Sequence, residues 1–189
     1  MKKIGIIGRG FVGSAVEFGF SSQTGCNAEI KVYDKNIKLS QDGLSDTVNS
    51  SDFIFLSVPT PSNSDGSINL EIIESALEEI SNVNKRSDNI ILIRSTIVPG
   101  TTRAFQQKFK NLNFVFNPEF LTERSAKFDF INQSRFILGG NNKLTSKVAS
   151  LYKWRFGKSL PVIQTNFETA ELIKYMNNCF FATKVSFLN

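Results

Sequence analysis

A glycine motif near the start of the chain constrains the fold more than any other feature. The motif Gly8-Arg9-Gly10-Phe11-Val12-Gly13 follows an apolar run from Lys3 to Ile7 and opens a helix-like stretch. Asp34 ends the next apolar run, and the fingerprint of dinucleotide-binding domains has its acidic residue about 20 residues after the glycines. A strand, a glycine turn, a helix and an acidic residue in this order therefore predict a domain that binds a dinucleotide.

Each glycine of the motif has a physical role in this prediction. Gly8 permits a tight turn, Gly10 lets the backbone approach the pyrophosphate, and Gly13 lets the helix pack on the strand. The amino terminus of the helix then faces the phosphate charge. We expect the cofactor to contact Gly8, Gly10, Phe11, Val12 and Gly13.

Asp34 and Lys35 bear on the choice between NAD and NADP. The Asp34 carboxylate can accept hydrogen bonds from the adenine ribose hydroxyls, and it would repel a 2′-phosphate. Lys35 follows directly and could soften this preference. We expect NAD as the cofactor, with both residues beside its ribose.

The first 100 residues alternate short β-branched runs with helix-like stretches. This alternation is typical of a doubly wound sheet, whose buried parallel strands are apolar throughout. We therefore predict an α/β, Rossmann-type fold with a mostly parallel sheet. The expected strands are residues 3–7, 30–33, 53–58, 90–94, 114–116, 135–138 and 162–164, and the expected helices are residues 11–20, 70–81, 101–110 and 144–156.

The stretch 167–189 contains no glycine or proline and is predicted to form one long helix. Apolar residues occupy most of its sides, so we expect it to be buried against another surface. If it is exposed, we expect the chain to dimerise or to be poorly soluble.

Composition excludes several classes of function. With 41% hydrophobic residues the chain can build a core, and its net charge of +5 suits anionic ligands but falls short of a nucleic-acid footprint. Histidine is absent and Cys26 lies far from Cys179, so we expect free thiols, no metal and no histidine-based catalysis. No segment has about 18 consecutive apolar residues. We therefore expect a cytoplasmic protein without a nucleic-acid or membrane partner.

Three segments follow predicted strands, and open α/β sheets bind ligands at the carboxyl ends of their strands. The loop 59–67 is either a binding loop or a plain connection, and Ser95-Thr96 lies where the nicotinamide end of a dinucleotide would be. The third segment, residues 116–123, contains Glu119 and Glu123. Following Pro118, these carboxylates are also compatible with acids at a helix amino terminus.

The segment Asn117-Pro118-Glu119-Phe120-Leu121, together with four others, resembles the UDP-glucose/GDP-mannose dehydrogenase family. The others are Val58-Pro59-Thr60-Pro61 and the segments 95–102, 136–140 and 171–178, all in family order. The resemblance implies two successive NAD-dependent oxidations, which convert a nucleotide-sugar alcohol to a carboxylate through a cysteine-bound thiohemiacetal and thioester. UDP-glucose is the expected substrate, and GDP-mannose is the alternative.

The resemblance also implies catalytic residues. Thr96 matches a threonine near the nicotinamide and the catalytic water, Glu119 matches a carboxylate at the substrate C6 end, and Glu123 matches a glutamate whose segment bridges cofactor and substrate. Lys174 and Asn178 match the pair that stabilises oxyanion charge, and residues four apart on a helix share a face. Taken alone, these two residues would favour a surface lysine and a solvent-facing amide, and only the resemblance reverses that interpretation. The other implied contacts are Val58, Pro59, Thr60 and Ser95 for the cofactor and Phe120 and Leu121 for the substrate.

By the same resemblance, residues 1–166 are the NAD-binding domain, and residues 167–189 begin a central helix that runs between domains and contributes to a homodimer. No segment here matches the family's glycine-rich cysteine segment or its carboxy-terminal domain. We therefore expect these 189 residues to bind NAD without completing the oxidation. Cys179 lies within the predicted helix and is expected to be a core thiol.

Two local departures from the family pattern concern the site. Arg124 stands where the family usually has glycine, and it could pair with a neighbouring acid or contact a substrate phosphate. The segment 34–52 is shorter than the corresponding segment usual in the family, and it lies where the adenine end of the cofactor would bind. A rival prediction from another class is a stand-alone NAD-binding module that docks on a partner chain through its apolar helix.

Overall fold

The computed structural model describes all 189 residues as an alternation of strands and helices. The strands are β1 (Lys3–Ile7), β2 (Glu29–Tyr33), β3 (Phe53–Leu56), β4 (Ile90–Ile93), β5 (Phe114–Phe116), β6 (Phe136–Gly140) and β7 (Val162–Thr165). The helices are α1 (Phe11–Phe20), α2 (Leu44–Ser50), α3 (Glu71–Val83), α4 (Thr101–Lys108), α5 (Ala126–Ile131), α6 (Asn142–Phe156) and α7 (Phe167–Leu188), with short 3-10 turns η1 (Ser22–Thr24) and η2 (Glu123–Ser125).

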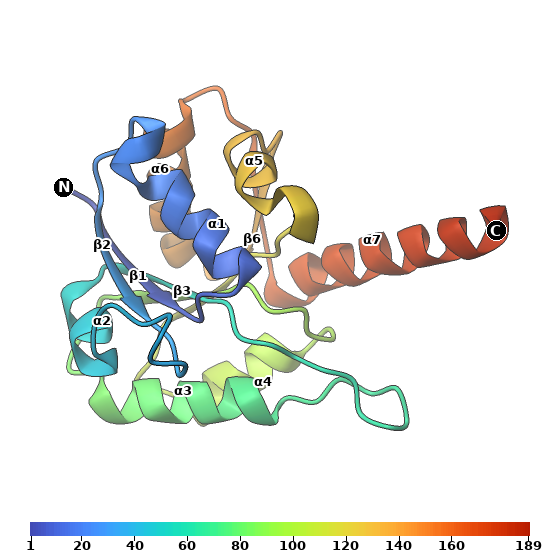
Figure 1. Ribbon diagram of the computed structural model, residues 1–189. Helices are drawn as coiled ribbons and strands as arrows, with labels where there is room; N and C mark the ends of the chain where they lie inside the picture. The colour runs from blue at the N-terminus through green and yellow to red at the C-terminus, as the bar shows by residue number, and fades with distance from the viewer.

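The strands form one seven-stranded sheet between two helical layers, with α1, α5 and α6 on one side and α2, α3 and α4 on the other (Figure 1). Successive residues of a strand point to opposite faces. In β3, Phe53 and Phe55 therefore join the core under the first layer, whereas Ile54 and Leu56 join the core under the second. Burial on both faces explains why this strand is apolar throughout.

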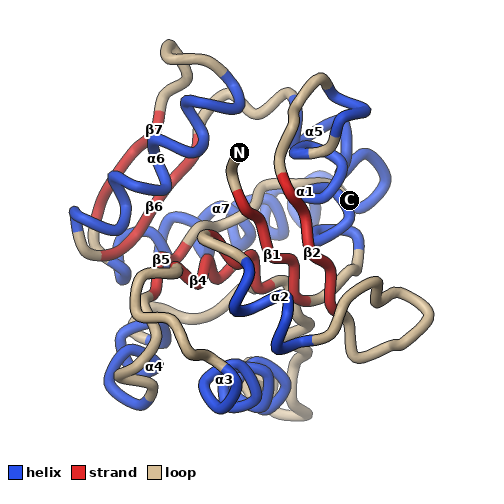
Figure 2. Tube along the Cα trace, turned by 90° about the vertical axis from the view of Figure 1, so that its left-hand side faces the viewer, coloured by secondary structure: helices blue, strands red, loops and turns tan.

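The strand order β2-β1-β3-β4-β5-β6-β7 brings the carboxyl ends of β1 to β5 to one edge of the sheet (Figure 2). These five strands are parallel, and β6 is antiparallel to β5. The expected α/β, Rossmann-type, mostly parallel sheet is confirmed. Since β1 lies between β2 and β3, the chain reverses its direction across the sheet there, and doubly wound folds bind ligands at this switch point.

Two helices were missing from the sequence-based prediction. Helix α2 lies within the segment 34–52 and buries only Thr47 and Val48, and α5 buries only Ala126 and Phe130. Helices this short show too few turns for an apolar period to stand out. The other predicted strand and helix bounds lie within two residues of the observed ones, as when β3 ends at Leu56 rather than at residue 58.

Helix α7 leaves the body of the molecule and projects outward (Figure 1). Only Phe167, Ala170, Glu171 and Lys174 are buried, because the helix contacts β5, β6 and α4 only near its start. This chain by itself therefore covers only the start of the helix, and the surface expected to cover the rest is not within these 189 residues. No helix of the structure is both long enough and apolar enough to cross a membrane.

Candidate active site

A cavity of about 400 Å³ lies at the carboxyl ends of β1 to β5. Residues from each of these strand ends contribute to its wall, so segments distant in sequence meet at the switch point of the sheet. The lining residues are Gly8, Gly10, Phe11, Val12, Asp34, Leu39, Ser57, Val58, Pro59, Thr60, Arg94, Ser95, Thr96 and Glu119.

The glycine turn forms the floor of the cavity. Gly8 has φ +89°, and a Cβ built there would lie 2.4 Å from the Ser57 carbonyl oxygen. A Cβ at Gly13 would lie 1.9 Å from the Gly8 carbonyl oxygen, so only glycine lets α1 start this close to the turn. A Cβ at Gly10, by contrast, would meet no atom within 4 Å. The chain therefore leaves open space above Gly10 itself.

Helix α1 points its amino terminus at this space. Phe11 to Gly13 form its first turn, where backbone N–H groups have no acceptor within the helix, and no acidic side chain lies in this turn. Such a terminus attracts an anion through its free donors and the helix dipole. The open space at Gly10 and the first turn of α1 together fit a pyrophosphate.

Asp34 is held in a defined orientation at the edge of the cavity. Its Oδ2 accepts the Arg9 backbone N–H at 2.6 Å, and its Oδ1 accepts the Asn36 backbone N–H at 2.7 Å. Lys35 lies outside the cavity, where its exposed ammonium is 3.4 Å from the Glu79 carboxylate on α3. The acidic residue therefore borders the cavity, and the neighbouring lysine points elsewhere.

Hydroxyl groups tie the ends of β3 and β4 together. Ser95 Oγ donates to the Val58 carbonyl oxygen at 2.6 Å, and Thr60 Oγ1 donates to the Thr96 carbonyl oxygen at 2.8 Å. The Thr96 side chain is half-buried and forms no hydrogen bond within the chain. Its hydroxyl is thus free to interact with a ligand in the cavity.

Glu119 and Lys174 form a buried ion pair between the loop after β5 and helix α7. Lys174 Nζ donates to Glu119 Oε1 at 2.9 Å, and the two side chains are only 6% and 11% exposed. Glu119 Oε2 accepts the Leu121 backbone N–H at 2.6 Å. The ammonium also lies 5.4 Å from the centre of the Phe120 ring. Lys174 is therefore a buried partner of the cavity wall and not a surface lysine.

Glu171 anchors α7 beside this pair. It is fully buried, and its carboxylate accepts the backbone N–H groups of Gly100 at 2.6 Å and Thr102 at 2.8 Å. A carboxylate in this position satisfies donors at the start of α4. The start of α7 is thereby held against the sheet, which places Lys174 at Glu119.

Several predicted site residues lie outside the cavity. Glu123 begins η2 and is exposed, and Asn178 is exposed one turn beyond Lys174 on α7. Phe120 and Leu121 pack partly against the two cores. The helix amino-terminus interpretation is wrong for Glu119, which lies in an irregular loop before η2.

Two further sequence expectations are corrected by the structure. Arg124 is exposed and forms no ion pair, so pairing with a neighbouring acid is wrong. Cys179 is an exposed thiol on the projecting part of α7 and not a core thiol. Cys26, the other free cysteine, is buried before the start of β2, and burial raises the pKa of its thiol. Neither cysteine lines the cavity.

Sequence reasoning missed Arg94, which lines the cavity and is 1% exposed. Its Nη1 donates to Asn117 Oδ1 at 2.8 Å and to the Tyr152 hydroxyl at 3.4 Å, and that hydroxyl donates to the same Asn117 oxygen. Burial raises the pKa of Tyr152 to about 12. This network holds Asn117, and with it the start of the loop that carries Glu119. Arg94 directly follows the apolar run 90–93, and a charged residue at the end of a buried strand could have indicated a site residue.

The fold and the cavity define a Rossmann-type dinucleotide-binding domain. The family model described as "UDP-glucose/GDP-mannose dehydrogenase family, NAD binding domain" matches residues 27–155. The chain therefore belongs to the UDP-glucose/GDP-mannose dehydrogenase family, as an NAD-binding domain.

Similar proteins extend well beyond the matched region. An uncharacterized protein of Methanocaldococcus jannaschii, MJ1054, is 43% identical over 149 residues, which are 75% of this chain and 17% of that protein. The UDP-glucose 6-dehydrogenase of Rickettsia prowazekii is 38% identical over 144 residues, 73% of this chain and 33% of the enzyme. The UDP-glucose dehydrogenase structure from Pyrobaculum islandicum matches all of this chain and 52% of its own, with a TM-score of 0.85 and 26% identity. The chain thus spans about a third of the curated dehydrogenase that it matches.

Proposed function

We propose that this chain is the NAD-binding part of a nucleotide-sugar 6-dehydrogenase that oxidises UDP-glucose to UDP-glucuronate with two NAD. One observation carries the proposal: a single cavity brings the glycine turn and Asp34 together with Thr96 and Glu119. The first two belong to dinucleotide recognition, and the other two are polar groups at the opposite end. Such a cavity suits a cofactor whose reactive ring meets a substrate alcohol.

In this proposal, NAD lies across the switch point of the sheet. Gly10 and the first turn of α1 hold the pyrophosphate, Asp34 accepts hydrogen bonds from the adenine ribose, and Ser95 and Thr96 border the nicotinamide. When bound there, NAD supplies the hydride acceptor for oxidation of an alcohol. The protein contributes orientation and charge around the reacting carbon.

Glu119 and Lys174 are proposed to act at that carbon. The carboxylate can accept a proton from a reacting alcohol or water, and the ammonium can stabilise an oxyanion. Asn178 and Glu123 are proposed to join them when substrate is bound. Since neither cysteine lines the cavity, the chain alone supplies no thiolate for a covalent intermediate, and we expect binding without turnover.

The first test of the proposal is Gly10→Ala, which we expect to weaken NAD binding at least about tenfold. The backbone at Gly10 has φ −69° and ψ −164°, which alanine adopts readily. Its new methyl group would touch no protein atom, so the variant should fold normally while the methyl group occupies the proposed pyrophosphate space. Calorimetric titration with NAD measures the effect.

Gly43→Ala is the matched control for this test. Gly43 also precedes a helix, has φ −79° and ψ 152°, and has no atom within 4 Å of a built Cβ. Its substitution should leave NAD affinity unchanged. Equal NAD affinities for Gly10→Ala and the wild type would reject the proposed cofactor position.

A parallel titration tests which nucleotide, UDP or GDP, the sugar substrate carries. We propose UDP-glucose because curated relatives of the chain are UDP-glucose 6-dehydrogenases. GDP-mannose is the second candidate, since the fold also matches a GDP-mannose dehydrogenase structure with a TM-score of 0.83. Both sugars are titrated side by side in the presence of NAD, with the tighter ligand identifying the substrate class.

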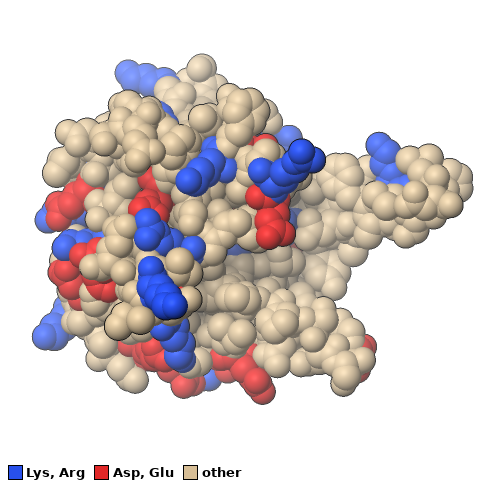
Figure 3. All heavy atoms as spheres, in the orientation of Figure 1, with Lys and Arg blue, Asp and Glu red and all other residues tan.

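We also propose that α7 forms a homodimer. Its projecting part exposes a row of large apolar side chains, and its surface in Figure 3 carries little charge apart from a basic group near its end. The exposed residues are Leu172, Met176, Phe180, Phe181, Val185, Phe187 and Leu188. An apolar patch of this kind on a helix is typical of a protein interface.

Light scattering tests the dimer, and we expect the wild-type chain to dissociate only on dilution. Phe180→Glu combined with Val185→Glu should give a monomer with unchanged NAD affinity, because both residues lie far along α7 and outside the cavity. A wild-type chain that remains monomeric at every concentration would contradict the proposal.

A further inference from the structure

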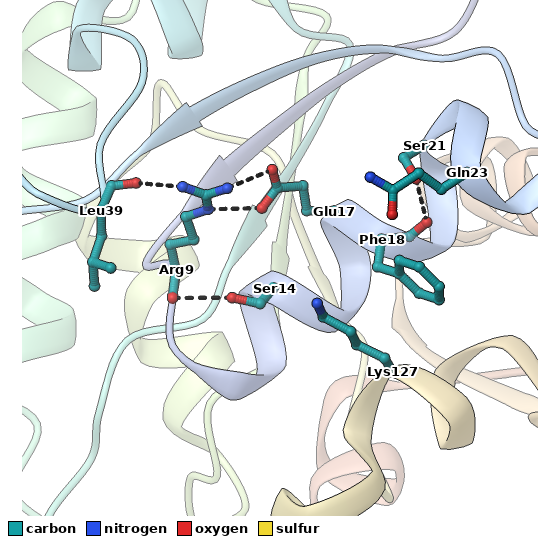
Figure 4. Close-up of a pocket in the computed structure, with 8 residues that line it drawn as sticks. All are labelled: Arg9, Ser14, Glu17, Phe18, Ser21, Gln23, Leu39 and Lys127. Carbon is teal, nitrogen blue, oxygen red and sulfur yellow. Dashed lines mark hydrogen bonds and ion pairs between the residues drawn. The ribbon is translucent and has the colours of Figure 1, made fainter.

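Arg9 and Glu17 form an ion pair beside the proposed adenosine site. Arg9 Nε donates to Glu17 Oε2 at 2.7 Å, and Arg9 Nη2 donates to Glu17 Oε1 at 2.8 Å (Figure 4). Two parallel bonds of this kind form the geometry in which arginine binds a carboxylate most strongly. The side chains are only 26% and 22% exposed, so the pair is held and partly shielded from solvent.

The remaining donors of the Arg9 guanidinium are also occupied. Nη1 donates to the Leu39 carbonyl oxygen at 3.2 Å, and Figure 4 shows the guanidinium between Leu39 and Glu17. With the Gln41 amide oriented so that its oxygen faces Arg9, that oxygen accepts from Nη1 at 3.2 Å and from Nη2 at 2.8 Å. The guanidinium is thus bound between α1 and the loop after β2.

This ion pair lies directly beside the proposed ribose site. The backbone N–H of Arg9 donates to Asp34, the proposed ribose ligand, and Leu39 lines both the cavity and the hollow around Arg9. Arginine is the side chain best suited to bind a phosphate through two parallel hydrogen bonds. An unpaired Arg9 would therefore attract the 2′-phosphate of NADP and oppose the repulsion from Asp34.

We propose that Glu17 is a specificity-determining residue that favours NAD over NADP by binding and neutralising Arg9. The inference rests on the proposed function and adds a residue on α1 to the selection made by Asp34. The pair occupies the donors and cancels the charge that a 2′-phosphate would need. Lys35 is the rival cation near this site, and its ammonium is 3.4 Å from Glu79.

Glu17→Gln tests this role because it removes the charge and keeps the shape of the side chain. We expect NADP to bind about tenfold more tightly to the variant than to the wild type, the size of one new hydrogen bond to a charged group. The affinity for NAD should change by no more than about twofold. Calorimetric titrations with NAD and NADP measure both, and thermal unfolding verifies that the variant is folded.

Two further variants assign the effect to Arg9. In Arg9→Gln combined with Glu17→Gln, the gain in NADP affinity should disappear. Glu79→Gln frees Lys35 in the same way that Glu17→Gln frees Arg9, and it should leave NADP affinity unchanged. A gain in Glu79→Gln instead of in Glu17→Gln would assign selection to Lys35 and overturn the proposal.

Each remaining outcome is decisive. If the wild type binds NAD and folded Glu17→Gln gains no NADP affinity, the role of Glu17 is rejected while the proposed function stands. If the wild type binds no NAD, the proposed function itself fails. Should Glu17→Gln not fold, Arg9→Gln combined with Glu17→Gln provides the test, because it removes both charges of the pair together. The NADP-to-NAD affinity ratio should then stay unchanged, and a drop in it would show that Arg9 already binds the phosphate.

Discussion

Replacing Gly13 by alanine is expected to destabilise the protein by about 3 kcal/mol, the upper end of what one added methyl group costs in a packed interior. For a chain of this size that loss lowers the melting temperature by roughly 10 °C. The new Cβ would lie 1.9 Å from the Gly8 carbonyl oxygen and 3.3 Å from Ile6 Cγ2. The nearest atom belongs to the backbone, so no flexible side chain can move aside.

The glycine turn has little freedom to accommodate that methyl group. Gly8 donates its N–H to the Tyr33 carbonyl oxygen at 3.0 Å and is pressed against Ser57 on its other side. Either α1 must shift away from the sheet or the turn must distort. We expect NAD binding to fall with either movement, because both displace the first turn of α1.

Gly10→Ala separates the packing effect from the ligand effect. It makes the same chemical change three residues earlier, where the methyl group meets open space, so its free energy of unfolding should match that of the wild type. Equilibrium urea unfolding of the two variants measures the difference. Equal stabilities for Gly13→Ala and the wild type would show that α1 does not need the close approach to the turn.

The second large effect is expected at the buried ion pair, where Lys174→Met should cost about 3 kcal/mol of unfolding free energy. The substitution leaves the Glu119 carboxylate without its cation in a site where the carboxylate side chain is 11% exposed. A buried charge without a partner is strongly unfavourable, whereas the aliphatic part of methionine fills most of the vacated volume. The loss therefore reports the stranded charge and not a cavity.

Glu119→Gln in the Lys174→Met background should recover most of the lost stability, since it removes that charge. The matched control is Arg103→Met, which breaks an ion pair that also joins α7 to the body. The side chains of Arg103 and Glu168 are 55% and 38% exposed, and pairs that open to solvent contribute less than about 1 kcal/mol. Urea unfolding that finds Lys174→Met as mild as Arg103→Met would contradict a buried pair at Glu119.

Most of the fold could be predicted from local patterns. The glycine turn, the two-sided apolar strands such as β3 and the amphipathic helix α3 each show their periodicity within a few residues. Helices α2 and α5 could not be predicted, because each buries only two residues and owes its place to tertiary packing. The exposure of α7 could not be predicted either, since an apolar helix shows that it needs a partner surface but not whether this chain provides one.

The site was predicted in the same unequal way. Residues within three positions of a strand's carboxyl end, such as Asp34 and Thr96, were expected at the switch point and line the cavity. Arg94 was missed because the partners of its Nη1, Asn117 and Tyr152, are remote in sequence. The Arg9–Glu17 pair joins the glycine turn before α1 to the second turn of that helix. No sequence motif marks such a pair, so it could not be predicted.

The sequence by itself determined the α/β class of this protein, the position of its glycine turn and its membership of a dehydrogenase family. It did so because these properties depend on local conformation and on the spacing of residues along the chain. Only the tertiary structure decided that Lys174 is buried on Glu119, that Glu17 occupies Arg9, and that α7 stands free. The two ion pairs join side chains that lie 8 and 55 residues apart in the sequence. Whether such side chains meet, and how deeply they are buried, is decided by the packing of the helices on the whole sheet.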